Sequence, residues 1–125
     1  MKKVLIVGGT GFLGFHFAKY CLSQNFEVIS VSRKKPKKIR YLKKIKYIYE
    51  NISNKKKVMI KLKPFSDVNY VVNFGGEVVH KKLKSTFESH YNGAKNICDF
   101  YLNKSLKKYL QVGSSLEYGK SKSPH

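Results

Sequence analysis

The fold of this chain is decided near its N-terminus, by the stretch Val4-Leu5-Ile6-Val7-Gly8-Gly9-Thr10-Gly11-Phe12-Leu13-Gly14. Four aliphatic residues that stop at a glycine predict a short buried strand. The glycines lead into residues 12–24, where apolar side chains recur at helical spacing. In this strand–turn–helix context, glycines let backbone amides approach a pyrophosphate, and the helix N-terminus adds its positive end.

The glycines fit two versions of this motif. Gly9, Gly11 and Gly14 match G-x-G-x-x-G, and Gly8, Gly11 and Gly14 match G-x-x-G-x-x-G equally well. A glycine-rich turn without a ligand is the weaker alternative in this context. We therefore predict that Gly8, Gly11, Phe12, Leu13 and Gly14 contact the phosphates of a dinucleotide cofactor.

Strand and helix patterns alternate along the whole chain. The strands are expected at 4–7, 27–32, 47–49, 68–74 and 109–112, and the helices at 12–24, 37–44, 55–63 and 86–102. The last helix is expected to bury Phe87, Tyr91, Ala94, Ile97, Cys98 and Tyr101. This alternation predicts a single α/β domain over residues 1–125, a doubly wound parallel sheet of five strands in the order 3-2-1-4-5.

The composition is strongly basic but does not indicate a specific nucleic-acid partner. Of 125 residues, 26 are Lys or Arg and 7 are Asp or Glu, which gives a formal net charge of +19. The basic clusters are spread along the chain, and only Arg33 and Arg40 are arginine, the residue that base and phosphate readers favour. We expect a solvated lysine surface with weak, salt-sensitive binding to polyanions.

The remaining composition points to a cytoplasmic protein. The apolar run that ends at Val7 is too short for a signal peptide, and no run is long enough to span a membrane. Cys21 and Cys98 are too few for a disulfide framework or a metal site.

Four motifs together resemble one family. Residues Val7 to Gly14 resemble the N-terminus of the extended short-chain dehydrogenase/reductases, the NAD(P)-dependent nucleotide-sugar epimerases and dehydratases. Asn73-Phe74-Gly75-Gly76 resembles the family segment beside the cofactor, commonly His-Leu-Ala-Ala. Gly93-Ala94-Lys95-Asn96-Ile97 resembles Gly-Thr-x-Asn-Leu, and Gly113-Ser114-Ser115-Leu116-Glu117-Tyr118-Gly119 resembles Ser-Ser-x-x-x-Tyr-Gly.

The resemblance implies a Rossmann domain, a nucleotide-sugar substrate, hydride transfer at a sugar carbon and a homodimer. It implies that Phe74, Gly75 and Gly76 lie beside the cofactor. It also implies that Asn51 and Ile52 lie near the adenine, with Asn51 in place of the family's acid. His90 stands where the family usually has Asn.

The resemblance also implies which residues carry catalysis. Ser114, four residues before Tyr118, matches the active-site hydroxyl of the family, and Ser115 is the alternative. Glu117 is one residue later than the Glu of family dehydratases, which favours an epimerase or a reductase over a dehydratase.

The family is usually at least twice this long. Its catalytic Tyr-x-x-x-Lys helix and its substrate-binding portion are therefore expected beyond His125. Tyr118 and Lys122 have the Tyr-x-x-x-Lys spacing, but Gly119 and Pro124 make a stable helix there unfavourable. The chain is interpreted as the cofactor-binding part of such an enzyme, inactive alone, with a non-catalytic cofactor-binding module as the alternative.

The end of the second expected strand bears on the choice of cofactor. NAD-specific domains carry Asp or Glu about 20 residues after the glycines, to bind the ribose hydroxyls. Here that region reads Ser30-Val31-Ser32-Arg33-Lys34, with no acid between Val28 and Arg40. Ser32 and Arg33 suit a 2′-phosphate, which predicts NADP, with NAD as the alternative.

Overall fold

The computed structural model describes residues 1–75 and 88–113. They form one five-stranded sheet in the order β3-β2-β1-β4-β5, and every neighbouring pair is parallel. The strands are β1 (Lys3–Val7), β2 (Glu27–Ser32), β3 (Lys46–Tyr49), β4 (Tyr70–Asn73) and β5 (Lys108–Gln111). The predicted doubly wound sheet and its strand order are confirmed.

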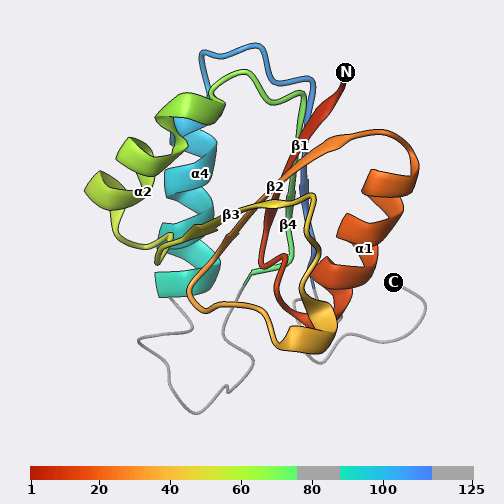
Figure 1. Ribbon diagram of the computed structural model, residues 1–125. Coiled ribbons are helices and arrows are strands. Elements are labelled where there is room, and N and C mark those ends of the chain that lie inside the picture. The colour runs from red at the N-terminus through yellow and green to blue at the C-terminus, as the bar shows by residue number, and fades with distance from the viewer. Residues whose placement is uncertain (76–87, 114–125) are drawn as a thin grey trace, which may run out of the picture.

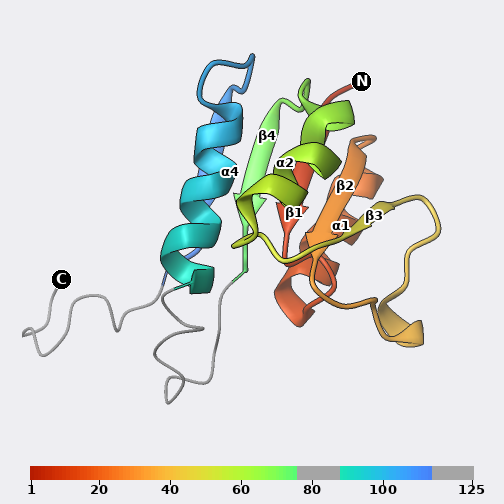
Figure 2. The ribbon, with the colours of Figure 1, turned by 90° about the vertical axis from the view of Figure 1, so that its left-hand side faces the viewer.

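The helices cover the sheet from both sides. Helix α1 (Phe12–Ser23) packs on one face, and α2 (Lys55–Leu62) and α4 (Ala94–Tyr101) pack on the other (Figures 1 and 2). This follows from the handedness of the connections. The connection from β1 to β2 moves toward one edge of the sheet, and the connections into β4 and β5 move toward the other edge. Because the connections are right-handed, opposite directions of travel place their helices on opposite faces.

Side-chain alternation along the strands creates a core on each face. In β1, Leu5 and Val7 join the larger cluster under α2 and α4, whereas Val4 and Ile6 join the smaller cluster under α1. All four are at most 2% exposed. A strand buried on both faces explains why the sequence from Val4 to Val7 is continuously apolar.

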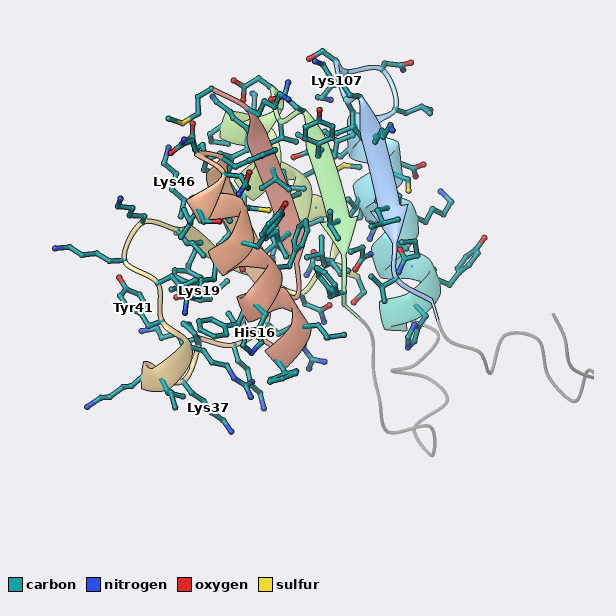
Figure 3. The ribbon with its side chains drawn as sticks, turned by 90° about the vertical axis from the view of Figure 1, so that its right-hand side faces the viewer. His16, Lys19, Lys37, Tyr41, Lys46 and Lys107 are labelled. Carbon is teal, nitrogen blue, oxygen red and sulfur yellow. The ribbon has the colours of Figure 1, made fainter. Side chains whose placement is uncertain are left out.

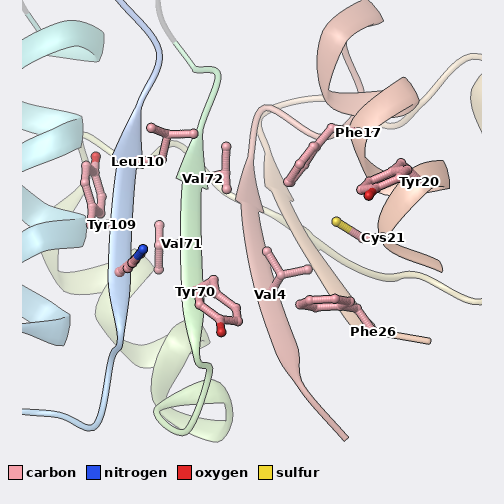
Figure 4. Close-up of a pocket in the computed structure, with 11 residues that line it drawn as sticks. Val4, Phe17, Tyr20, Cys21, Phe26, Tyr70, Val71, Val72, Tyr109 and Leu110 are labelled. Carbon is pink, nitrogen blue, oxygen red and sulfur yellow. The ribbon is translucent and has the colours of Figure 1, made fainter. Parts of the chain in front are cut away.

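An apolar groove lies beside α1. It holds about 350 Å³ and runs between the helix and strands β4 and β5 (Figure 4). Its walls include Phe17, Tyr20 and Cys21 of α1, and Tyr70 and Leu110 of the strands. No residue of the glycine-rich turn lines the groove.

The predicted helix over residues 37–44 is wrong. Only a short 3₁₀ turn, η1 (Lys38–Arg40), forms there, and Ile39 is 83% exposed. Lys37 and Tyr41, which flank the turn in the sequence, are also exposed (Figure 3). Leu42 does pack against the smaller core cluster, but one partly buried side chain gives a short segment too little to offset the cost of helix nucleation.

The predicted long helix begins with a π-helical turn, η3 (Glu88–Gly93), before α4. A π turn holds more residues than an α turn, so it changes which positions face the sheet. Ile97 and Tyr101 are buried as predicted, but Tyr91 and Cys98 are exposed. Asn96 and Phe100 are buried beside them instead, and Phe87 lies outside the described residues.

The described residues contain no cluster of His, Cys, Asp and Glu that could hold a metal ion. Cys21 is buried and Cys98 exposed, and both are free thiols. In the same part of the chain, no helix has the length and apolar character needed to cross a membrane.

Candidate functional site at the carboxyl ends of the strands

The turn between β1 and α1 is shaped by three glycines with different surroundings. Gly8 has a φ of +83°, a left-handed conformation that favours glycine. Gly11 has room for a methyl group, whose nearest neighbour would be the Gly8 oxygen at 3.5 Å, an ordinary contact distance. A methyl group on Gly14 would overlap the Gly8 carbonyl oxygen. The left-handed turn therefore falls on Gly8 and the close helix packing on Gly14.

Gly9 is needed for a reason that the motif did not reveal. A methyl group on Gly9 would overlap the side chain of Ser30 in β2. Ser30 is fully buried, and its Oγ has no hydrogen-bond partner among the described residues. The turn thus lies directly on β2, and a small side chain at position 30 makes that possible.

The first turn of α1 is open to a negatively charged ligand. Gly11 is its N-cap and supplies no side-chain hydrogen bond, and the first turn holds no acidic residue. Phe12 and Leu13 are 60% and 58% exposed. The backbone amides at the start of α1 and the positive end of the helix dipole attract an anion. The residues present therefore fit the phosphates of a dinucleotide.

The end of β2 is tied to the glycine-rich turn. The Thr10 amide donates to Ser32 Oγ at 3.4 Å, and Ser32 is 8% exposed. Arg33 follows at once and is exposed. The other arginine, Arg40, places its guanidinium carbon 5.6 Å from the centre of the Phe12 ring, a cation–π contact with the first residue of α1.

The loop after β3 is held from two sides. Asn51 Oδ1 accepts hydrogen bonds from the Ser53 amide at 3.0 Å and the Ser53 hydroxyl at 2.7 Å. From α4, Asn96 Nδ2 donates to the Ile52 carbonyl at 2.8 Å. The Ile52 side chain lies in the larger core, so this residue offers a ligand mainly its backbone. The sequence motif included Asn96, but it did not predict the hydrogen bond from Asn96 to this loop.

The only acid of this loop, Glu50, is already engaged. Its carboxylate accepts a hydrogen bond from the Asn51 amide at 3.0 Å and lies 3.4 Å from Lys61 Nζ. The amide hydrogen bond and the neighbouring Lys61 lower the pKa of Glu50 below its usual value. At neutral pH, Glu50 is therefore an anion whose carboxylate already binds the Asn51 amide of its own loop and Lys61 of α2.

The end of β4 lies against the glycine-rich turn. A methyl group placed on Gly8 would be 3.1 Å from the Gly75 nitrogen. The Phe74 amide donates to the Val7 carbonyl at 2.8 Å, and the Phe74 ring lies 5.6 Å from the Phe17 ring of α1. The structure thus brings Phe74 and Gly75 together with Gly8, Gly11, Phe12, Leu13, Gly14 and Ser32 at one end of the sheet.

Three of the predicted site residues, Gly76, Ser114 and Ser115, lie outside the described residues, as do Glu117, Tyr118 and Lys122. His90 lies in η3 and is exposed.

A doubly wound parallel sheet with an open glycine-rich turn between its first strand and first helix defines a Rossmann domain of the nucleotide-binding class. The family can be named as well. Residues 4–125 match the model of the NAD dependent epimerase/dehydratase family, and the chain belongs to this family. Comparison with curated proteins gave no significant match.

Solved structures of two epimerases and of an enzyme in complex with NAD and UDP share this fold. UDP-glucose 4-epimerase from Thermotoga maritima, solved with UDP-glucose, has a TM-score of 0.87 at 15% identity, over 98% of this chain and 41% of that one. The Bordetella bronchiseptica enzyme WbmG, solved with NAD and UDP, has a TM-score of 0.83 at 18% identity, over 94% and 39%. The UDP-Glc/GlcNAc 4-epimerase from Campylobacter jejuni has a TM-score of 0.83 at 19% identity, over 96% and 39%. The chain spans about two fifths of the length of these structures.

Proposed function

We propose that this chain is the NAD(P)-binding part of a nucleotide-sugar epimerase-type oxidoreductase. The observation that carries the proposal is the glycine-rich turn beside the end of β4, which leads into an exposed, acid-free first turn of α1, in a member of the epimerase/dehydratase family. When bound, NAD(P) supplies hydride transfer at a sugar carbon, while the protein supplies binding, orientation and proton transfer.

Each part of the site has a role in this proposal. The glycine-rich turn and the amides of Phe12, Leu13 and Gly14 hold the pyrophosphate. The ends of β2 and β3 hold the adenosine half through Ser32, Arg33 and the backbone of Asn51 and Ile52. The ends of β4 and β5 take the other half of the cofactor and the nucleotide sugar. The structural neighbours solved with NAD, UDP or UDP-glucose support this arrangement by their common fold.

We further propose that NADP is preferred to NAD. Ser32 places a hydroxyl at the end of β2, the exposed Arg33 can form a bidentate pair with a 2′-phosphate, and the chain has no acid between Val28 and Arg40. Arg40, held over the Phe12 ring, adds a second guanidinium near the first turn of α1. NAD remains the alternative, because neighbours of this fold are solved with NAD.

Titration of the chain with both cofactors at one salt concentration tests these proposals. We expect tighter binding of NADP, and a loss of about tenfold or more in NADP affinity in Arg33→Gln, because a charge-assisted hydrogen bond is lost. NAD affinity is expected to stay within about twofold. Lys34→Gln is the matched control, since it removes the same charge from the next exposed position. Tighter binding of NAD by the wild type would disprove the NADP preference, and binding of neither cofactor would disprove the function.

We propose that Ser114 is the hydroxyl that hydrogen-bonds the substrate oxygen whose proton moves during hydride transfer. In a form of the enzyme that turns over a nucleotide sugar, Ser114→Ala should lower kcat by about 100-fold or more, with cofactor affinity nearly unchanged. Ser115→Ala is the matched control. If Ser115→Ala shows this loss and Ser114→Ala does not, the catalytic hydroxyl belongs to Ser115.

A further inference from the structure

The side chain of Asn73 connects three segments at the end of β4. Asn73 is fully buried. Its Oδ1 accepts a hydrogen bond from the Gly75 amide at 2.8 Å, and its Nδ2 donates to the Tyr109 hydroxyl of β5 at 3.1 Å. The Tyr109 hydroxyl in turn donates to Gln111 Oε1 at 2.7 Å. The Asn73 amide is therefore held in one orientation from two sides.

The first of these hydrogen bonds fixes the backbone just after β4. Gly75 also lies close to the glycine-rich turn, since a methyl group placed on Gly8 would be only 3.1 Å from the Gly75 nitrogen. A methyl group on Gly75 would lie 3.0 Å from Asn73 Oδ1 and 3.1 Å from Val7 Cγ1. Gly75 thus fills a narrow space between Asn73, Val7 and Gly8.

The strand order says which half of the cofactor this segment would meet. With the adenosine half over the ends of β2 and β3 and the pyrophosphate at the turn after β1, the remaining half extends over β4 and β5. We propose that Asn73 is a positioning residue that aligns Phe74 and Gly75 with the half of the cofactor beyond the pyrophosphate, and that Tyr109 orients Asn73. This inference rests on the proposed cofactor-binding function.

Tyr109 suits this task because it remains a neutral hydroxyl. Burial raises the pKa of Tyr109 to about 12, so it both accepts from Asn73 and donates to Gln111 throughout the physiological range. Without its hydroxyl, Asn73 Nδ2 would be a buried donor that has lost its partner. The Asn73 amide would then turn to find another acceptor, and the hydrogen bond to Gly75 would weaken.

The test compares the whole cofactor with its adenosine half. Wild type, Tyr109→Phe and Asn73→Ala are titrated with NADP and with 2′,5′-ADP, and with the pair NAD and AMP if NAD is the tighter cofactor. We expect Tyr109→Phe to weaken the whole cofactor about fivefold and Asn73→Ala about tenfold or more, with affinity for the adenosine half within about twofold of wild type. Tyr70→Phe, at the opposite end of β4 from Asn73, is the matched control and should change neither affinity.

A structural role alone would weaken both ligands together, so the ratio of the two affinities is the decisive quantity. Equal losses for the whole cofactor and its half, or no loss in Tyr109→Phe, would overturn the role of Asn73 and Tyr109 while the proposed function stands. Should Asn73→Ala fail to fold, Tyr109→Phe still decides the question, because it removes one hydroxyl from a half-buried residue of strand β5. A wild type that binds neither cofactor would overturn the function and this inference together.

Discussion

Gly14→Ala is expected to lower the free energy of unfolding by about 3 kcal/mol, the upper end of the range for overpacked interiors. The new methyl group would overlap the Gly8 carbonyl oxygen and lie 2.7 Å from Gly9 Cα and 2.9 Å from the Gly8 carbonyl carbon. All three are backbone atoms, so no side-chain rotation can relieve the contact. Urea unfolding followed by circular dichroism measures the loss, and cofactor affinity should fall with it because the turn is displaced.

Gly11→Ala is the matched control for Gly14→Ala. Gly11 has φ −77° and ψ 178°, which alanine adopts without strain, and the nearest atom to its methyl group would be 3.5 Å away. We expect a stability change below about 1 kcal/mol, the cost of alanine at an N-cap, but a loss of about tenfold or more in cofactor affinity because the methyl group enters the ligand's space. An equally stable Gly14→Ala would show that the turn does not pack on α1 as described.

Tyr101→Ala is expected to lower the free energy of unfolding by about 3–5 kcal/mol, as for other large-to-small changes in a core. Tyr101 is 2% exposed and belongs to the larger core cluster. Its ring packs edge-on against the Phe100 ring, with 4.8 Å between the ring centres. Its hydroxyl donates to the Phe65 carbonyl at 3.0 Å. The burial of this ring also raises the pKa of Tyr101, so it stays neutral and hydrogen-bonded at physiological pH.

Two variants separate the contributions of the ring and the hydroxyl. Tyr101→Phe keeps the ring and should cost only about 1 kcal/mol, the value of one hydrogen bond. Tyr20→Ala on α1 is the matched control, since Tyr20 is 60% exposed, and it should change stability by less than about 0.5 kcal/mol. A loss of stability in Tyr20→Ala as large as that in Tyr101→Ala would contradict the placement of Tyr101 in the core and of Tyr20 on the surface.

The fold was predictable from local patterns. The apolar run before Gly8, the helical spacing after it and the strand–helix alternation indicated a doubly wound sheet and its order. These signals are strong because a parallel sheet buries its strands on both faces, which leaves continuous apolar runs in the sequence. The helical pattern between Pro36 and Ile45 was misleading, because Leu42 packs against the core but Ile39, on the same predicted face, is exposed.

The sequence by itself determined the class of site, because four glycines between a strand and a helix have few structural alternatives. Only the tertiary structure decided how the site is held together. It distinguished Gly8 from Gly9, placed Ser30 beneath the turn, and joined Asn96 to Ile52 and Asn73 to Tyr109 across 44 and 36 residues of chain. The physical reason is that periodicity reports which face of an element is buried, whereas a hydrogen bond between distant residues depends on the packing of whole elements against each other.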